Sequence, residues 1–276
     1  MIWILNKIAI MLEKMRTLVL LFIFILVAFC SCGNHKKDKQ DCEEKDVIMY
    51  ELASIDDDFD EQIIEHIGYT VSYNYKRHIP NWVAYQLTKE ETEGEEERSD
   101  DFFVDPMVKG VAVEADEYKH SGYDRGHMAP AGDMKWSEQA MHESFYMTNI
   151  CPQNSNNNRG DWKSLEELAR DWACKYGSIY ICCGPIVENE ETVIGHGLRI
   201  VVPQAFYKVF LRREEGSWYS IGFVMENKAQ DRPLMTYAVT VDEIEEKTGI
   251  DFFYQLPDSI EKVVEADFDF ADWSVN

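Results

Sequence analysis

The order of apolar and polar residues predicts β-strands over much of the chain after residue 68. Val71, Tyr73 and Tyr75 alternate with polar neighbours, and the alternation resumes over residues 83–87. A period of two residues is typical of a strand, because successive side chains point to opposite faces of a sheet. The same kind of pattern predicts further strands over residues 179–183, 198–202, 205–212 and 218–225.

Two segments carry the spacing of an amphipathic helix instead. Apolar residues recur at intervals of three and four over residues 161–176, with charged residues between them. This segment is therefore expected to be one helix whose apolar stripe packs in the core. A shorter helix is expected over residues 240–247, because Thr240 and Glu243 form a capping-box pattern and Gly249 follows as a stop signal.

The mixture of strands and helices predicts a single α+β domain over residues 68–257. Residues 33–67 are polar and acidic with one short apolar segment, a composition typical of a linker or tether. Residues 258–276 form an acidic tail that keeps apolar side chains such as Trp273, which would allow it to dock on the domain.

Residues 1–32 are predicted to be an export signal. Three basic residues precede an unbroken apolar run from Leu18 to Cys30, whose 13 residues are fewer than the about 20 that span a membrane comfortably. A serine before Cys32 favours a lipoprotein signal whose cysteine is acylated and attaches the chain to a membrane. A plain cleaved signal peptide and an uncleaved anchor are the alternatives. We therefore expect an exported protein, as a lipoprotein in the periplasm or at the cell surface, or else secreted.

The chain is strongly acidic, with a formal net charge of −24 at pH 7. A uniformly acidic surface would repel nucleic acid, because nucleic-acid affinity depends on Lys and Arg neutralising phosphates. The acidic residues are concentrated at 56–60, 90–97, 100–101 and 261–272, whereas residues 109–175 interleave acids with Arg125, Lys135, Arg159, Lys163 and Arg170. We expect the acidic blocks to be solvated and to face away from any binding groove.

The cysteines point to no metal site. Cys182 and Cys183 lie in an apolar strand-like run, so their side chains should point to opposite faces of the sheet. Cys-x-x-Cys does not occur, and a zinc site is therefore not predicted.

The candidate chemistry lies in one segment, Asp-Arg-Gly-His at residues 124–127. An imidazole ordinarily titrates near neutrality, so His127 is expected to be able to take a proton from water, and the guanidinium of Arg125 to hold the negative charge that develops on phosphorus. Gly126 is expected to let the backbone turn tightly between them. The grouping favours a phosphodiesterase site over an ordinary loop with a core histidine.

Later motifs make a resemblance specific. Asn-Ile-Cys-Pro-Gln occupies residues 149–153, and an asparagine-rich loop ending near Asn158 leads into a Trp-x-x-Leu-Glu pattern at residues 162–166. With Asp-Arg-Gly-His, these motifs resemble the DNA/RNA non-specific endonuclease family in content and order. Similar segments extend the resemblance from residue 68 to residue 257.

The resemblance implies a central antiparallel sheet with a ββα-metal active site. His127 would be the general base that activates water, and Asn158 would be the one direct protein ligand of Mg²⁺, for which Mn²⁺ could substitute. The resemblance assigns Glu166 to holding a metal-bound water. Direct coordination by both residues is not expected, since eight residues of one helix would place Glu166 about 12 Å from Asn158. Without the resemblance, Asn158 would be a turn former and Glu166 a solvated helix carboxylate.

The resemblance also implies roles for three further residues. Asn149 would help to order the site, and Arg125 would face the scissile phosphate. Arg98 would be a second arginine that holds phosphate. A structural salt bridge for Arg125 and a surface ion pair for Arg98 are the alternatives.

The implied activity is that of a metal-dependent, sugar-non-specific endonuclease that hydrolyses phosphodiester bonds in DNA and RNA. One alternative is a nuclease-like binding domain of a surface lipoprotein whose chemistry is weak or lost. Another is a structural surface lipoprotein, which would leave the site motifs unexplained.

Overall fold

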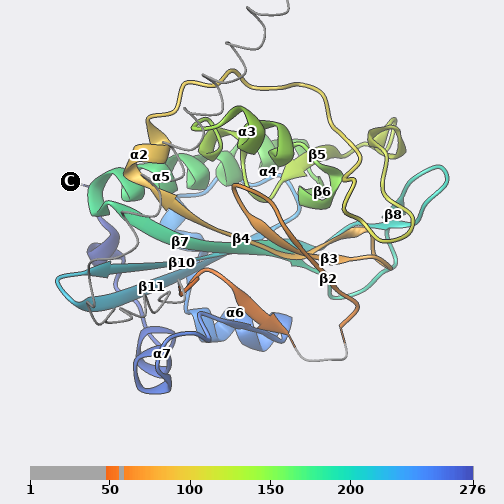
Figure 1. The fold of residues 1–276 in the computed structure, drawn as a ribbon. Helices are drawn as coiled ribbons and strands as arrows, with labels where there is room; N and C mark the ends of the chain where they lie inside the picture. The colour runs from red at the N-terminus through yellow and green to blue at the C-terminus, as the bar shows by residue number, and fades with distance from the viewer. Residues whose placement is uncertain (1–47, 56–58, 276) are drawn as a thin grey trace, which may run out of the picture. The chain divides into compact units, whose positions relative to one another are not determined.

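A seven-stranded antiparallel sheet forms the centre of the computed structural model, which describes residues 48–55 and 59–275 (Figure 1). Its strands lie in the order β12-β11-β10-β7-β4-β3-β2, and all neighbours are antiparallel. Their bounds are β2 Gln62–Glu65, β3 Thr70–Asn74, β4 Ile79–Thr88, β7 Ser178–Ile186, β10 Ala205–Glu214, β11 Ser217–Glu226 and β12 Ala238–Val239. The expected α+β class with a central antiparallel sheet is confirmed.

Shorter elements surround this sheet. The remaining strands pair as β1 (Ala53–Ile55) with β13 (Ile250–Phe252), β5 (Asp124–His127) with β6 (Ile150–Gln153), and β8 (Val193–Ile194) with β9 (Ile200–Val201). The α-helices are α2 Lys89–Thr92, α3 Glu138–Ser144, α4 Ser155–Arg159, α5 Asp161–Tyr176, α6 Val241–Thr248 and α7 Asp258–Val264. Single 3₁₀ turns are η1 Ala115–Tyr118, η2 Ala131–Asp133, η3 Met147–Asn149, η4 Leu234–Tyr237 and η5 Phe270–Trp273. Across the described ranges, the helices are all too short or too polar to cross a membrane.

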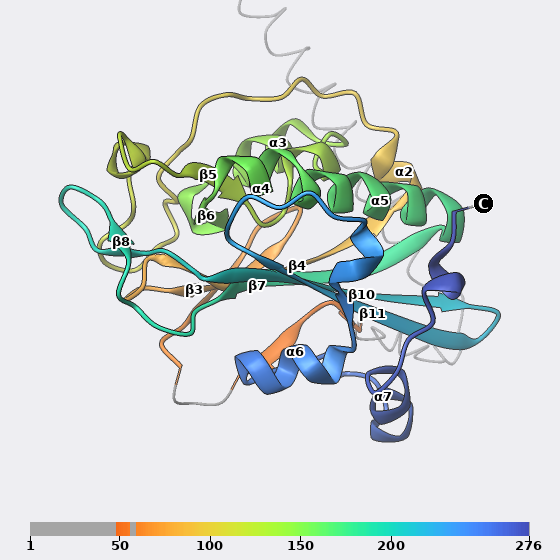
Figure 2. The same ribbon diagram turned by 180° about the vertical axis from the view of Figure 1, so that it is seen from behind.

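Both faces of the sheet are covered (Figures 1 and 2). Helices α3, α4 and α5 lie over one face, and α6 and α7 lie over the other. On the α5 face, Trp162, Leu165 and Trp172 pack into one hydrophobic core. On the α6 face, Val241 and Ile244 pack into a second core. The central sheet is therefore the middle layer of three.

Alternate residues of the central strands enter alternate cores. In β10, Phe206 packs in the α5-face core and Tyr207 in the α6-face core. In β7, Cys183 belongs to the first core and Cys182 to the second, which confirms that these cysteines point to opposite faces. Because helices cover both faces, even the polar members of the alternating pattern in β3 are buried.

The two helices predicted from spacing and capping are confirmed. α5 spans Asp161–Tyr176, the full predicted segment. α6 begins after Thr240, whose hydroxyl accepts a hydrogen bond from the backbone N–H of Glu243 at 3.1 Å. It ends at Gly249, which is left-handed with φ of 69°. The N-cap bond of Thr240, which is one half of the expected capping box, and the stop at Gly249 form because capping depends on residues close together in sequence.

The structure differs from the expected linker over residues 33–67. β1 pairs with β13 near the other end of the chain, and β2 is the edge strand beside β3. Ile64 of β2 is fully buried. The polar composition predicted a linker, but backbone hydrogen bonds to distant strands hold these segments in place, and composition does not reveal such bonds. The predicted signal at residues 1–32 and the linker up to residue 47 lie outside the described residues.

The acidic tail docks on the domain, as its apolar residues allowed. Trp273 is 1% exposed, and its carbonyl accepts a hydrogen bond from Nε1 of Trp172 at 2.5 Å. The guanidinium of Arg212 lies over the Trp273 ring at 5.2 Å. The folded unit therefore continues beyond the expected boundary at residue 257.

Candidate active site

The Asp-Arg-Gly-His segment is a strand rather than the tight turn expected from Gly126. It forms β5 and pairs antiparallel with β6, with Gly126 opposite Cys151. A Cβ built on Gly126 would lie 2.6 Å from the Cβ of Gln153, well inside contact distance. The glycine is needed because the Gln153 side chain crosses this point, and not because the chain turns there.

Two helices follow the β5–β6 hairpin and complete the site. Asn158 lies in α4 and Glu166 in α5, and the backbone at Gly160 (φ −105°, ψ −111°) separates the two helices. The asparagine-rich segment expected to be a loop is therefore helical, and the two residues do not share one helix axis. β5 thus supplies Arg125 and His127, the 3₁₀ turn before β6 supplies Asn149, and the two helices supply Asn158 and Glu166.

A cleft of about 530 Å³ opens at this hairpin and is lined by five of the predicted site residues: Arg98, Arg125, His127, Asn158 and Glu166. The sixth, Asn149, is fully buried and lies behind the cleft. Its Oδ1 accepts from the N–H of Ala129, and its Nδ2 donates to the carbonyls of Ala129 and Ser144, each at 2.8 Å. Asn149 therefore positions the backbone that follows His127 and does not face the cleft itself.

The imidazole of His127 is buried between aromatic rings. Its ring centroid lies 5.3 Å from that of Phe102 and 4.8 Å from that of Phe145. Its Nε2 has no hydrogen-bond partner among the described residues. Burial, with added repulsion from Arg98 and Arg125, lowers the pKa of His127 to about 3. The ring is therefore neutral at physiological pH, with a lone pair or N–H that no described residue engages.

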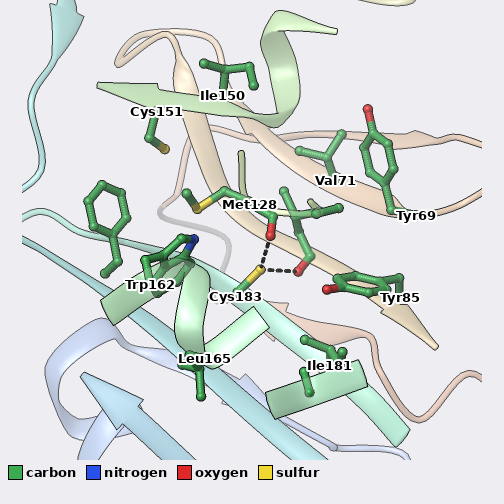
Figure 3. Close-up of a cluster of buried hydrophobic side chains, with 14 of the residues drawn as sticks. Tyr69, Val71, Tyr85, Met128, Ile150, Cys151, Trp162, Leu165, Ile181 and Cys183 are labelled. Carbon is green, nitrogen blue, oxygen red and sulfur yellow. Dashed lines mark hydrogen bonds between the residues drawn. The ribbon is translucent and has the colours of Figure 1, made fainter. Parts of the chain in front are cut away.

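Core residues hold the backbone at His127 from beneath. The carbonyl of His127 accepts from Nε1 of Trp162 at 3.4 Å. The next carbonyl, of Met128, accepts from Sγ of Cys183 at 3.2 Å and from Nζ of Lys208 at 3.3 Å. Figure 3 shows Cys183 and Trp162 next to Met128 in the α5-face core. The histidine thus stands on a rigid part of the molecule.

Asn158 is oriented by Asp124. The Asp124 carboxylate accepts from Nδ2 of Asn158 at 3.0 Å, from Ser155 Oγ at 2.8 Å and from Arg159 Nε at 2.9 Å. Burial would raise the pKa of Asp124, but these hydrogen bonds outweigh it and lower the pKa. Since an ionised carboxylate can only accept, Asn158 must present its nitrogen to Asp124 and its oxygen elsewhere. Oδ1 of Asn158 accepts no hydrogen bond from any described residue and is free to bind a ligand.

Glu166 is a partly buried carboxylate on the cleft wall. Burial raises its pKa to about 7, and the neighbouring Lys208 opposes this rise. Within the described parts of the chain, the Glu166 carboxylate makes neither a salt bridge nor a hydrogen bond. It can therefore hold a water or a cation at neutral pH, where its ionised and protonated forms are close in energy.

The two predicted arginines flank the histidine. The guanidinium of Arg125 lies 4.4 Å from the centroid of the Phe102 ring, and that of Arg98 lies 5.2 Å from the Phe145 ring. Neither forms a salt bridge with a described residue, so neither alternative interpretation applies there. Arginines stacked on rings and free of carboxylates keep their donors for another anion.

The cleft is cationic although the chain is acidic. Six cationic and two acidic side chains line it: Arg98, Lys119, Arg125, Arg159, Lys163, Arg170, Asp124 and Glu166. Over the described ranges, the acidic blocks seen in the sequence contribute nothing to its lining. This agrees with the expectation that those blocks are solvated away from the groove. The cleft can attract a polyanion that the rest of the surface would repel.

Sequence patterns alone gave no role in the site to two cationic side chains that support it, Arg170 and Lys208. Arg170 lines the cleft and donates to the buried Asp133 at 2.7 Å, and Asp133 also accepts from Tyr85 at 2.8 Å. Lys208 is fully buried with its Nζ 4.7 Å from the Trp162 ring centroid. A lysine between Phe206 and Phe210 in a buried strand was the available signal, because such a charge is costly without a purpose.

Comparison with known proteins agrees with this geometry. A model of the DNA/RNA non-specific endonuclease family matches residues 54–259. The chain is 35% identical over 209 residues to a mitochondrial nuclease EXOG of Xenopus laevis, a match that covers 70% of this chain but 58% of that protein. It is 32% identical over 207 residues to human mitochondrial endonuclease G, covering 69% of each. The chain thus spans less than two thirds of the EXOG relative.

A solved structure of EndoG in complex with EndoGI has the same fold, with a TM-score of 0.66 and 30% sequence identity. The match covers 72% of this chain and 89% of that chain. The sheet and the hairpin-helix site therefore define a ββα-metal nuclease fold. The match to the family model over most of the folded unit identifies the chain more closely. It belongs to the DNA/RNA non-specific endonuclease family.

Proposed function

We propose that this protein is a metal-dependent endonuclease that hydrolyses phosphodiester bonds in both DNA and RNA. The observation that carries the proposal is the position of His127, a neutral imidazole with an unpartnered Nε2 in a cationic cleft. Family membership supports the reaction class. The proposal extends to this chain the activity that the names of its relatives describe.

The residues of the cleft fit Mg²⁺, with Mn²⁺ as a substitute. Oδ1 of Asn158 is a hard neutral ligand with no described hydrogen-bond donor, and Glu166 is an unpaired carboxylate beside the same cleft. Mg²⁺ keeps several of its waters and uses few protein ligands, so this donor set is sufficient. Asn158 would bind the ion directly and Glu166 would hold one of its waters. The bound ion would neutralise charge on the phosphate and the leaving oxygen.

His127 would act as the general base. Its Nε2 would accept a proton from the attacking water while Trp162, Asn149 and the Met128 backbone contacts keep the ring in place. A pKa of about 3 describes the cleft without substrate. An anionic phosphate near the ring would raise that pKa and make His127 a stronger base, because opposite charge favours the imidazolium.

Arg125 and Arg98 would hold the phosphate during the reaction. Both present guanidinium donors at the cleft, stacked on Phe102 and Phe145. Negative charge on the non-bridging oxygens increases as water attacks, and fixed cations stabilise it. Contacts of this kind read the phosphate backbone rather than the bases, which is why both DNA and RNA are expected substrates.

The test is cleavage of plasmid DNA and of RNA with Mg²⁺ and with a chelator. His127→Ala is expected to reduce cleavage by at least about 100-fold, the usual contribution of a general base. Asn158→Ala is expected to abolish the response to Mg²⁺. His196→Ala is the matched control, because His196 is exposed and does not line the cleft. Unchanged cleavage by a folded His127→Ala protein would refute the assignment.

The alternative, a binding domain without nuclease activity, predicts a different experimental result. It predicts that the wild-type chain binds nucleic acid but does not cleave it with any divalent cation. The unpartnered Nε2 of His127, Oδ1 of Asn158 and carboxylate of Glu166 argue against it, since a site that has lost its chemistry has no reason to keep unpaired polar groups.

We further propose that the protein is exported and attached to a membrane through a lipid on Cys32. The support is the sequence of the leader, its short apolar run and the serine before the cysteine. Membrane fractionation of cells that express the wild type or Cys32→Ser tests it. Cys32→Ser is expected to move the nuclease out of the membrane fraction. If both proteins are soluble outside the cytoplasm, the leader is a plain signal peptide.

A further inference from the structure

Three carboxylates meet on the α6 face of the sheet, away from the nuclease cleft. Asp242 and Glu245 lie on α6, three residues apart, and Glu265 follows the last turn of α7. Figures 1 and 2 show both helices on the opposite side of the sheet from α5. The backbone joins the elements here as well, because the N–H of Asp242 donates to the carbonyl of Glu265 at 3.2 Å.

The carboxylate oxygens converge. One oxygen from each of the three residues lies within 4.8 Å of the other two. Oxygens around one Ca²⁺ ion lie about 2.3–2.6 Å from it, so two of them are at most about 5 Å apart. The spacing therefore suits three ligands of a single cation. In the described part of the chain, no Lys or Arg forms a salt bridge with Asp242, Glu245 or Glu265.

The burial of Glu265 distinguishes this cluster from an ordinary acidic surface. It is 3% exposed, and its Oε1 is buried without a hydrogen-bond partner among the described residues. A buried carboxylate that nothing pairs is costly, because it has lost its hydration without gaining a partner. Such an atom points to a ligand that completes the site.

The ionisable groups that act on Glu265 are all carboxylates. Burial raises the pKa of Glu265 to about 9, and the nearby carboxylates of Glu245, Glu261, Asp242 and Asp251 raise it further. Burial also raises the pKa of Glu245 to about 7. A divalent cation would neutralise this repulsion between the carboxylates.

We propose that Asp242, Glu245 and Glu265 form a structural calcium site that fastens the C-terminal helix α7 to α6. The ligands are all oxygens, which excludes the softer metals that prefer nitrogen or sulfur. Three carboxylates from the protein favour Ca²⁺ over Mg²⁺, because Mg²⁺ uses one or two carboxylates and keeps its waters. The site is independent of the cation proposed for the cleft, since it shares no residue with it.

The test measures calcium binding in a chain whose cleft cannot bind a metal. The full chain carrying Asn158→Ala is titrated with CaCl₂ by calorimetry at about pH 8, above the pKa of about 7 of Glu245. One Ca²⁺ per chain is expected. Addition of Glu265→Gln is expected to remove this binding. Glu246→Gln is the matched control, because Glu246 is an exposed α6 carboxylate outside the cluster and its loss should change nothing.

Thermal unfolding supplies a second measurement, in which the order of the two unfolding temperatures should depend on calcium. Calcium should raise the unfolding temperature of the Asn158→Ala chain and leave that of the Glu265→Gln double variant unchanged. Without calcium, the double variant should unfold at a higher temperature than the Asn158→Ala chain, because the unpaired buried carboxyl group of Glu265 is gone. Asp242→Asn, at an exposed position that tolerates change, should weaken calcium binding at least tenfold. Equal calcium binding with and without Glu265→Gln, or no binding in either chain, would overturn the proposal.

Discussion

Asp124 accepts a hydrogen bond from Nδ2 of Asn158 at 3.0 Å, and this bond decides which end of the Asn158 amide is left for the cleft. Asp124→Asn would allow the amide to reverse, because an asparagine can both donate and accept. We expect the Mg²⁺ concentration for half-maximal cleavage to rise by about 10- to 100-fold, as is usual when a residue that orients a metal ligand is lost. The rate at saturating Mg²⁺ should fall much less.

Asp171→Asn is the control for this variant, since Asp171 is an exposed carboxylate of α5 that does not line the cleft. It should need the same Mg²⁺ concentration as the wild type. If Asp124→Asn instead lowered the rate with no change in Mg²⁺ requirement, Asp124 would not act through Asn158.

The depressed pKa of His127 makes stability depend on pH in a defined window. The native group titrates near pH 3 and the unfolded group near 6.5. Below pH 6.5 the unfolded chain therefore binds a proton that the native chain refuses, and stability falls as the pH falls towards 3. Between about pH 7.5 and pH 5 this linkage removes about 2 kcal/mol from the free energy of unfolding. His127→Asn cannot titrate and should not lose this amount.

Urea denaturation in EDTA at the two pH values measures this difference, with His196→Asn as a control expected to follow the wild type. The wild type should lose about 2 kcal/mol more than His127→Asn over the interval. Identical pH dependence of the two proteins would mean that the imidazole is hydrated and not buried.

The cationic cleft predicts a steep dependence of activity on salt. Few cations anchor the substrate on an otherwise acidic protein, so kcat/KM should fall strongly as monovalent salt rises. Arg98→Gln removes one cleft cation that no described carboxylate pairs. The slope of log kcat/KM against log salt concentration should become shallower by about 1.

Arg213→Gln is the matched control for that slope. Arg213 is exposed at the end of β10, stacks on Trp218 and does not line the cleft. The slope of log kcat/KM against log salt concentration for Arg213→Gln should equal that of the wild type. A slope that is unchanged in Arg98→Gln would place the substrate phosphates elsewhere.

Gly126→Ala should damage both stability and activity. The added methyl would overlap the side chain of Gln153, which is fully buried and cannot move aside. Overpacking of this kind costs on the order of 1–3 kcal/mol, and the β5–β6 pair would separate at the residue before His127. Gly197→Ala is the control, because its nearest neighbour is the end of the Glu117 side chain at 3.1 Å. Urea denaturation and plasmid cleavage measure the two effects.

Local features of the fold were predictable from the sequence because their causes are local. The 3.6-residue spacing of α5 and the cap of α6 by Thr240 depend on neighbouring residues, and both helices form where expected. The edge strand β2 was not predictable, since its backbone is held by β3 and its composition is that of a linker. Gly126 was interpreted as a turn residue. The side chain that requires a glycine there, that of Gln153, lies 27 positions away in the sequence and could not be seen from the neighbouring residues.

The sequence by itself determined the chemical groups of the cleft: a histidine, two arginines, an asparagine and a glutamate, which are types that suit phosphodiester hydrolysis. The order of residues along the chain also determined which elements would carry them, because periodicity and capping act within a few residues. Tertiary structure alone decided the environment of each group. It buried His127 between Phe102 and Phe145, turned the oxygen of Asn158 away from Asp124, and brought Glu265 to α6. Burial, charge and pKa depend on atoms contributed by distant parts of the chain, which become neighbours only when the sheet is covered on both faces.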